Sequence, residues 1–275
     1  MEQQTILQQI GETVDAIRRV YDAKPLVGIV LGSGLGNLVR EIDVEKEIPY
    51  EQIPHFPVST VEGHQGKLIF GRLSGKAVVV LSGRFHFYEG YTPQQVVFPI
   101  RVLKFLGVET LLVSNAAGGM NAGFTVGDLM IIRDHISLFT VNPLLGKNES
   151  GLGPRFPDMS EPYSRDLIRK AKGIADRLGI PVWEGVYAGV TGPTFETRAE
   201  YKLLHIVGGD AVGMSTVQEV IAARHLGMAV FAMSVITDLG IREEENKITH
   251  EEVLAAATAA EPKLAGIFRA LVGEL

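Results

Sequence analysis

The chain has 275 residues, a net charge of −6 and no cysteine. The lack of cysteine excludes disulfides, thiolate metal sites and cysteine nucleophiles, and it fits a reducing compartment. The acidic balance argues against a role on nucleic acid or on a membrane surface. No apolar run is long enough for a signal peptide or a membrane span, so we expect a cytoplasmic enzyme with neither partner.

Apolar residues at helical spacing predict a first helix over residues 4–22, before Pro25. Residues 26–31 predict a buried strand that leads directly into GSGLG at 32–36. A strand followed by glycines and a helix is a phosphate-binding pattern, because backbone N–H groups can approach an anion and Ser33 adds a hydroxyl. The loop matches neither Gly-x-Gly-x-x-Gly nor a Walker A loop, and a structural turn explains it equally well.

Residues 48–58 are polar and rich in proline, and they predict an irregular connection. His64 follows between two glycines; a lone loop histidine is usually solvated, but this one has the freedom to reach a ligand. Two apolar runs at 67–73 and 76–81 then predict a hairpin that turns at Ser74-Gly75.

The end of this hairpin continues as LSGRFHFYEGY, residues 81–91. Arg84, His86 and Tyr88 occupy alternate positions, so in an extended segment their side chains leave the same face. Guanidinium, imidazole and phenol donors on one face form an anion-binding surface. A solvated strand end is an equally good interpretation of this segment alone.

The rest of the pattern predicts helices at 93–106, 164–178, 197–206, 217–226 and 249–271, and strands at 110–114, 129–132, 185–190, 210–213 and 229–236. Residues 115–123 predict a second loop of small residues at a strand end, where ligands collect in open α/β sheets. Residues 141–163 predict a long irregular loop, which in a compact domain is functional or lies at an interface. Repeats and composition breaks are lacking, so we expect one α/β domain over residues 1–275.

Helical crossovers between strands bring the strand ends to one rim of the sheet. Two groups of side chains would meet there: an anion-binding group of Ser33, Arg84, His86 and Ser215, and a group of Phe195, Glu196 and Asp238 that suits a flat polar heterocycle. A fixed anion beside such a heterocycle suits group transfer onto phosphate. The sequence shows no metal-ligand pattern and no Gly-x-Ser-x-Gly elbow.

Six motifs resemble the trimeric purine nucleoside phosphorylases in order and spacing, from about Ile10 to the C-terminus: GSGLG, SGRFHFYEGY, SNAAGGMN, TGPTFETRAEY, GMSTVQEV and THEEVLAA. The resemblance implies a mixed, twisted central sheet flanked by helices. It implies reversible phosphorolysis of purine (deoxy)ribonucleosides to the free base and (deoxy)ribose 1-phosphate, as in purine salvage. It also implies a homotrimer, with phosphate as co-substrate and no cofactor or metal.

The resemblance also assigns roles to individual residues. Its phosphate site falls on Ser33, His64, Arg84, His86, Ser215 and the backbone of Ala116. Its nucleoside site falls on Tyr88, Phe195, Glu196, Met214, Asp238 and His250, with His250 at the 5′-hydroxyl. The catalytic roles fall on His86, Glu196 and Asp238.

Two positions depart from the family pattern. Asp238 stands where the enzymes for 6-oxopurines carry asparagine, and an ionised aspartate cannot donate to a 6-oxo group. Either Asp238 is protonated beside Glu196, or the site tolerates 6-aminopurines, or the loop is arranged differently. Leu152 stands where many relatives place a phenylalanine over the sugar of a neighbouring subunit.

Three other functions remain open from the sequence. The first is a 5′-methylthioadenosine phosphorylase of the same fold, although His250 suits a 5′-hydroxyl better than a thioether. The second is a dinucleotide-binding oxidoreductase that uses GSGLG, which needs a ribose-binding carboxylate at a strand end about 20 residues on. Glu51 is near that spacing, but it lies in the proline-rich connection instead. The third is a nucleoside-binding protein without catalysis, which would not need a phosphate site.

Overall fold

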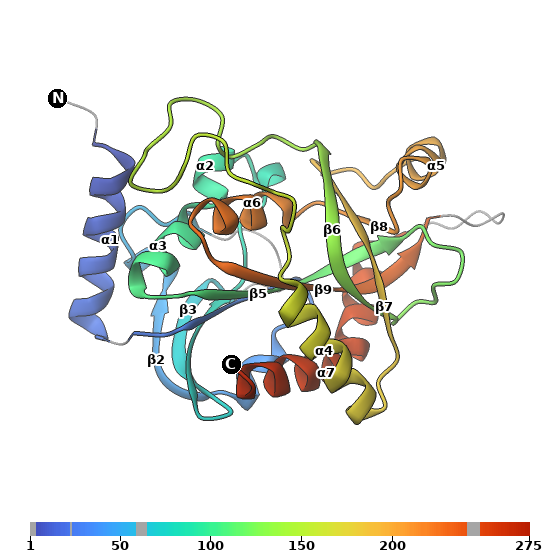
Figure 1. The fold of residues 1–275 in the computed structure, drawn as a ribbon, viewed down its shortest axis with the longest axis horizontal. Coiled ribbons are helices and arrows are strands. Elements are labelled where there is room, and N and C mark those ends of the chain that lie inside the picture. The colour runs from blue at the N-terminus through green and yellow to red at the C-terminus, as the bar shows by residue number, and fades with distance from the viewer. Residues whose placement is uncertain (1–3, 23, 59–64, 241–247) are drawn as a thin grey trace.

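The computed structural model describes residues 4–22, 24–58, 65–240 and 248–275 (Figure 1). A mixed sheet runs through it in the order β2-β3-β4-β1-β5-β8-β7-β6-β9. Its strands are β1 Val27–Leu31, β2 Asp43–Pro49, β3 Lys67–Leu73, β4 Lys76–Ser82, β5 Thr110–Gly119, β6 Leu129–Phe139, β7 Val182–Val190, β8 Ala211–Gly213 and β9 Ala229–Leu239. Because β9 pairs with both β6 and β5, the second half of the sheet closes into a ring.

Helices cover both faces of the sheet. The α-helices are α1 Ile6–Val20, α2 Pro93–Val96, α3 Phe98–Leu106, α4 Arg165–Leu178, α5 Arg198–Ile206, α6 Val217–His225 and α7 His250–Gly273. Figure 1 shows α4 and α7 side by side beneath the sheet, α1, α2, α3 and α6 on its other face, and α5 apart at one edge. Of the helices described, none combines the length and the apolar character needed to cross a membrane.

Local sequence signals set several boundaries as predicted. The Ser164 hydroxyl accepts the backbone N–H of Leu167 at the start of α4. Thr249 and Glu252 form a capping box at the start of α7. The hairpin of β3 and β4 turns at Ser74-Gly75, where both residues have positive φ.

Other predicted boundaries were wrong, and tertiary pairing explains most of them. The strand predicted to end at Ser114 continues to Gly119, because β9 pairs along its whole length. The strand predicted to end at Ile132 continues to Phe139 beside β7. The edge strand β2 was not predicted, because its side chains are mostly exposed and charged. The helix predicted over 93–106 is interrupted at Val97.

A bulge in the pairing of β5 and β9 affects the site directly. Ala117 pairs with Ile236 and Gly118 with Asp238, so Thr237 is the extra residue on β9. A bulge of this kind bends a strand and changes the direction in which the next side chain points. Asp238 is therefore aimed by the bulge at the end of β9.

Candidate active site

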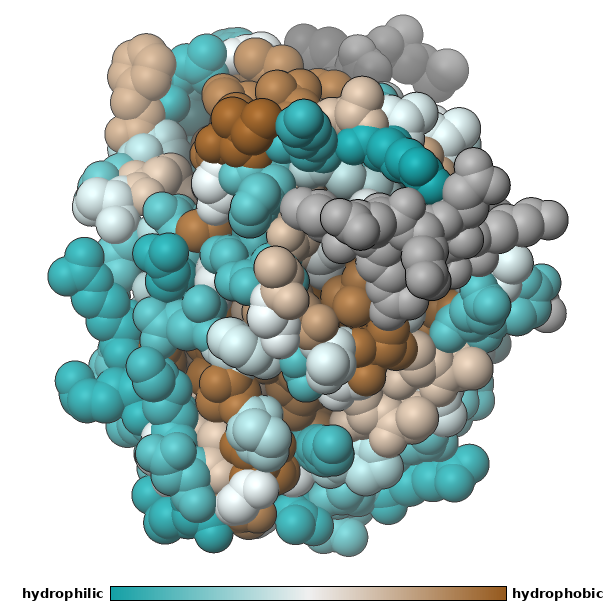
Figure 2. Space-filling view, turned by 90° about the vertical axis from the view of Figure 1, so that its right-hand side faces the viewer, coloured by the Kyte–Doolittle hydropathy of each residue, from teal (hydrophilic) through white to brown (hydrophobic). Residues whose placement is uncertain are grey.

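The predicted site residues meet in one cavity of about 360 Å³ at the rim of the sheet. Every one of them that lies in the described ranges lines this cavity: Ser33, Arg84, His86, Tyr88, Ala116, Phe195, Glu196, Met214, Ser215, Asp238 and His250. His64 lies outside the described residues. Figure 2 shows the side of the molecule that carries α5 and the end of β9, where apolar side chains gather near the middle of the face.

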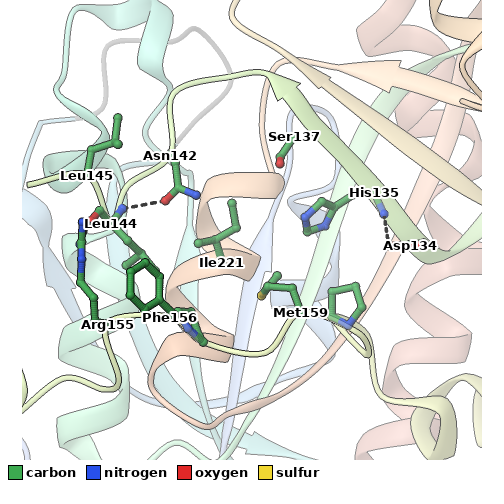
Figure 3. A pocket seen from close by; sticks show the side chains of 12 residues that line it. Asp134, His135, Ser137, Asn142, Leu144, Leu145, Arg155, Phe156, Met159 and Ile221 are labelled. Atoms are coloured by element: carbon green, nitrogen blue, oxygen red, sulfur yellow. Dashed lines mark hydrogen bonds between the residues drawn. The ribbon is translucent and has the colours of Figure 1, made fainter. Parts of the chain in front are cut away.

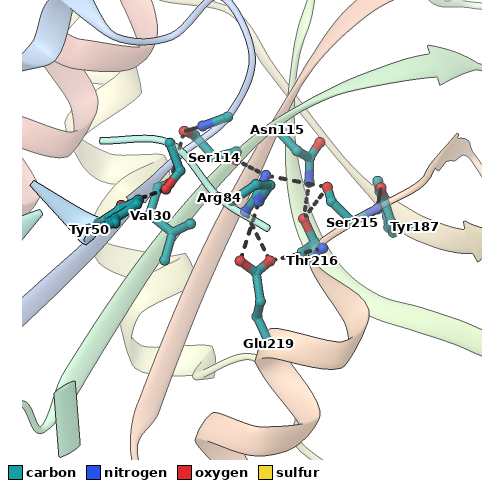
Figure 4. A network of polar contacts seen from close by, with 11 residues as sticks. Val30, Tyr50, Arg84, Ser114, Asn115, Tyr187, Ser215, Thr216 and Glu219 are labelled. Atoms are coloured by element: carbon teal, nitrogen blue, oxygen red, sulfur yellow. Dashed lines mark hydrogen bonds and ion pairs between the residues drawn. The ribbon is translucent and has the colours of Figure 1, made fainter. Parts of the chain in front are cut away.

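Arg84 forms the floor of one end of the cavity, which we call the anion end (Figure 4). Its Nη1 donates to the Ser114 carbonyl oxygen at 2.8 Å and to Oγ of Ser215 at 3.3 Å. Its Nε and Nη2 donate to the two carboxylate oxygens of Glu219 at 3.3 and 3.0 Å. Only 2% of the Arg84 side chain is exposed, so its charge requires this partner.

The residues before α6 adopt a tight, unusual turn at the anion end. Thr216 has φ 72° and ψ −55°, a strained conformation for a β-branched residue, and the Val217 N–H donates to the Ser215 carbonyl oxygen at 2.7 Å. Asn115 donates from Nδ2 to Oγ1 of Thr216 at 2.8 Å, and the Thr216 N–H donates to Glu219 at 3.0 Å. These contacts hold the Ser215 hydroxyl against Arg84 (Figure 4).

His86 lies beside this end. Its Nδ1 lies 3.0 Å from Oε1 of Glu89, and the same oxygen accepts the His86 backbone N–H at 2.8 Å. Burial lowers the pKa of His86 despite the opposing effect of Glu89. A proton on Nδ1 leaves the Nε2 lone pair as the second polar atom of the ring.

Tyr88 does not continue an extended segment as predicted. Residues Phe87–Glu89 form a short 3₁₀ helix instead. This turn stacks the Tyr88 ring on the His86 ring, with centroids 4.6 Å apart and planes at 17°. Both side chains nevertheless line the same cavity as Arg84, so the predicted grouping is correct although its geometry was not.

The glycine loop after β1 also reaches the anion end, although the predicted helix after it is only a 3₁₀ helix, Asn37–Glu41. A Cβ on Gly32 would come within 2.8 Å of the Ser114 carbonyl oxygen and 3.3 Å of Nη1 of Arg84. Gly34 has φ +73°, and a Cβ there would meet Ala257 of α7 at 2.8 Å. Glycine is therefore required for this loop to place Ser33 at the rim.

Two carboxyl groups form the opposite end of the cavity, which we call the carboxyl end. Glu196 lies just before α5, and burial raises its pKa, with the nearby charge of Asp238 adding to the effect. Asp238 accepts from the Thr237 hydroxyl at 3.1 Å and contacts the Tyr201 hydroxyl at 3.1 Å. Phe195 is partly exposed beside them, so its ring is available for stacking.

Met214 and His250 also line the cavity. Met214 packs against Gly192, where a Cβ would come within 2.3 Å of its sulfur atom. His250 is the first residue of α7 and is exposed.

Sequence reasoning missed two functional contacts in this cavity. Glu219 could have been suspected, because a glutamate three residues after Thr216 is a capping-box signal. Tyr201 gave no such signal, since an aromatic residue inside a predicted helix usually indicates core packing. Within the described ranges, histidine and acidic side chains nowhere form a group of three that could hold a metal ion.

A second cavity of about 440 Å³ lies against the long segment 141–163 (Figure 3). Its wall includes His135, and burial lowers the pKa of this residue to about 4. Phe156 at its edge is 87% exposed. Leu152, which stands where many relatives place a phenylalanine over the sugar of a neighbouring subunit, is only 5% exposed and packs against the core of its own chain.

Comparisons with known proteins agree with this geometry. Residues 26–273 match the phosphorylase superfamily. Purine nucleoside phosphorylase 1 of Geobacillus stearothermophilus is 50% identical over 263 residues, covering 96% of each chain. Purine nucleoside phosphorylase of Bos taurus is 51% identical over 250 residues, covering 88% of this chain and 86% of the relative. The crystal structure of Schistosoma mansoni purine nucleoside phosphorylase with adenosine superposes with a TM-score of 0.94 at 42% identity, covering 99% of both chains.

Proposed function

The chain belongs to the phosphorylase superfamily, among its purine nucleoside phosphorylases, and from this premise we propose how the cavity divides the reaction. The reaction is the reversible phosphorolysis of purine nucleosides. A phosphate oxygen bonds to C1′ of the sugar, the bond from C1′ to the base breaks, and its electron pair leaves with the purine. The superfamily match spans residues 26–273, which supports treating residues 1–275 as one domain.

The anion end binds the phosphate. Ser33, Arg84, His86 and Ser215 converge there with Ala116, whose backbone is a further candidate. His64 is a candidate from the sequence alone, because it lies outside the described residues. Neutral His86 suits this role, because its Nε2 lone pair can accept the proton of a hydrogen phosphate. Arg84 is already paired with Glu219, so it offers a fixed direction more than a free charge.

The middle of the cavity binds the sugar. The Tyr88 ring, stacked on His86, and the Met214 side chain would face the ribose or deoxyribose. His250 at the start of α7 would bond the 5′-hydroxyl. A bound sugar then places C1′ between the phosphate and the carboxyl end.

The carboxyl end binds the purine base. Phe195 stacks on the ring, Glu196 meets the N1 edge, and Asp238 meets N7 and the 6-substituent. Negative charge develops on the base only as the glycosidic bond breaks, so groups that stabilise this charge accelerate the reaction rather than merely tighten binding. A proton given to N7 by Asp238 is worth roughly 10²–10⁴ in rate.

The chain also self-associates, as a homotrimer, in this proposal. Apolar side chains at the end of β6 and on α5 are exposed, and Phe139 and Leu203 line a hollow together with Glu196. A second copy would cover them next to the carboxyl end. Phosphate is the co-substrate and no cofactor is proposed. The proposed location is the cytoplasm.

The observation that carries the proposal is the convergence of the predicted phosphate and nucleoside residues in one cavity. The test is a product assay with inosine, guanosine, adenosine and 5′-methylthioadenosine, each with and without phosphate. We expect release of base from purine nucleosides only when phosphate is present. Release without phosphate would indicate a hydrolase and contradict the anion end. Turnover of methylthioadenosine alone would favour the alternative, which the relatives reported above do not support.

A further inference from the structure

Tyr201 stands between the two carboxyl groups of the cavity. Its hydroxyl donates to Oδ2 of Asp238 at 3.1 Å, and Glu196 lines the same cavity, close enough for its carboxyl and the Tyr201 hydroxyl to shift each other's pKa. Only 3% of Tyr201 is exposed. The hydroxyl is therefore the polar atom that links the residue proposed to meet N1 with the residue proposed to meet the 6-substituent.

Two glycines leave the space that the Tyr201 side chain occupies. A Cβ on Gly118 would lie 2.9 Å from both the Tyr201 hydroxyl and Oδ2 of Asp238. A Cβ on Gly240 would come within 2.0 Å of the Tyr201 ring. The bulge near the end of β9 and the facing part of β5 thus leave a slot that only an unsubstituted backbone provides.

A tyrosine hydroxyl carries one proton and can donate to only one of two carboxylates. If both carboxyls were ionised, the other one would face the lone pairs of the hydroxyl oxygen. One additional proton removes this conflict, because the protonated carboxyl donates to the tyrosine oxygen and the tyrosine donates to the ionised carboxyl. Two such arrangements exist, with all donor directions reversed between them.

Thr237 adapts to both arrangements. Its hydroxyl lies 3.1 Å from Oδ1 of Asp238 and 3.3 Å from the Ala117 carbonyl oxygen, so its single proton has two acceptors. It can donate to Asp238 when that carboxyl is ionised and to Ala117 when it is not. The Thr237 hydroxyl therefore has an acceptor whether Asp238 is ionised or protonated.

We propose that Glu196, Tyr201 and Asp238 hold one shared proton that sits on either carboxyl, so that one site accepts both 6-oxopurines and 6-aminopurines. This inference rests on the proposed function, because it requires that Glu196 faces N1 and Asp238 the 6-substituent. Tyr201 acts in it as a positioning residue, through the two carboxyls.

The two purine classes present opposite patterns along this edge. A 6-oxopurine offers an N1–H donor and an oxygen acceptor, which match ionised Glu196 and protonated Asp238. A 6-aminopurine offers an N1 acceptor and an amino donor, which match protonated Glu196 and ionised Asp238. Moving one proton through Tyr201 converts the first pattern into the second without changing the charge of the site.

The surroundings favour a single negative charge on the pair. Glu200 in the first turn of α5 adds a negative field at Glu196. Across the cavity lie the cationic Arg84, which is paired with Glu219, and the histidines His86 and His250. The raised pKa of Glu196, caused first by burial, agrees with retention of one proton.

The test is isothermal titration of hypoxanthine and of adenine into the enzyme at neutral pH, in two buffers with different ionisation enthalpies. The buffer dependence of the heat gives the number of protons taken up. We expect about zero for both bases with the wild-type enzyme, because the proton is already bound. Uptake of a proton with adenine alone, or release of one with hypoxanthine, would overturn the proposal.

Two variants sharpen the result. Asp238→Asn removes the shared proton, so adenine should then bind with uptake of about one proton and hypoxanthine with none. Tyr201→Phe should cause uptake of about one proton with each base. No uptake with adenine in Asp238→Asn would place the proton on Glu196 alone and contradict sharing.

The failures of the two proposals differ. If the enzyme binds neither base and cleaves no purine nucleoside with phosphate, the proposed function is wrong. If phosphorolysis proceeds but the wild-type proton count differs between the bases, only the shared proton is wrong. The wild-type measurement decides this even if a variant does not fold.

Discussion

The two carboxylate oxygens of Glu219 accept hydrogen bonds from Nε and Nη2 of Arg84, at 3.3 and 3.0 Å. Both side chains are almost completely buried beneath the anion end of the cavity. Glu219 also accepts the Thr216 N–H at 3.0 Å, so one carboxylate fixes both the arginine and the strained turn that carries Ser215.

Glu219→Gln should destabilise the protein and weaken phosphate binding. Removing one partner of a buried ion pair costs about 3–5 kcal/mol, because the remaining charge is left without compensation. We expect the free energy of unfolding to fall by an amount near the lower end of this range, because Arg84 keeps its hydrogen bond to the Ser114 carbonyl oxygen. We also expect a higher KM for phosphate. Urea unfolding and phosphate kinetics measure the two effects.

The matched control is Glu47→Gln, which removes the partner of Lys67 in an exposed pair. Exposed pairs contribute about 0–1 kcal/mol, so stability and phosphate KM should barely change. Equal losses in both variants would contradict the role given to Glu219.

Asp238→Asn should shift preference toward 6-oxopurines. The variant has no proton to share with Glu196, so Glu196 is ionised in the free enzyme and must take up a proton before it can donate to N1 of adenosine. A lost hydrogen bond to a charged group is worth about 1.5–3 kcal/mol, or about 10- to 100-fold in the ratio of kcat/KM for inosine to that for adenosine. If the ratio of kcat/KM for inosine to that for adenosine does not change, Asp238 does not determine the specificity.

Tyr201→Phe should move the pH profile of kcat/KM. The hydroxyl stabilises the singly protonated pair, so without it the pair loses its proton at lower pH. We expect the alkaline limb to shift to lower pH for both inosine and adenosine, with activity recovered on acidification. Tyr163→Phe, which removes a hydroxyl bonded to His135 in the second cavity, should leave the profile in place. A uniform loss of rate without a shift would indicate packing alone.

Acidification should destabilise the fold partly through His135. Burial lowers its pKa in the folded protein to about 4, from 6.5 in the unfolded chain. Between these values the unfolded state binds a proton that the folded state does not, so stability falls as pH falls from about 6.5 to about 4. His135→Gln should reduce this slope, as measured by urea unfolding at several pH values. If the free energy of unfolding of the variant depends on pH as steeply as that of the wild type, groups other than His135 cause the loss of stability.

Much of the site was predictable from the sequence because its signals are local. Arg84 and His86 follow the end of β4, Ala116 lies in the run of small residues that follows the apolar part of β5, and Ser215 lies two residues before α6, so each is close to a boundary in the apolar pattern. Capping residues such as Ser164 and Thr249 mark helix starts for the same reason. The sequence therefore determined which side chains gather at the rim and which chemistry they suit.

The tertiary structure decided how these side chains are paired, and the pairs join residues far apart in the chain. Arg84 and Glu219 are 135 positions apart, and Tyr201 and Asp238 are 37 apart. Whether such groups meet depends on which strands become neighbours, on the bulge that aims Asp238, and on the slot that Gly118 and Gly240 leave for the tyrosine ring. No local pattern encodes these contacts, because each is a property of packing between elements.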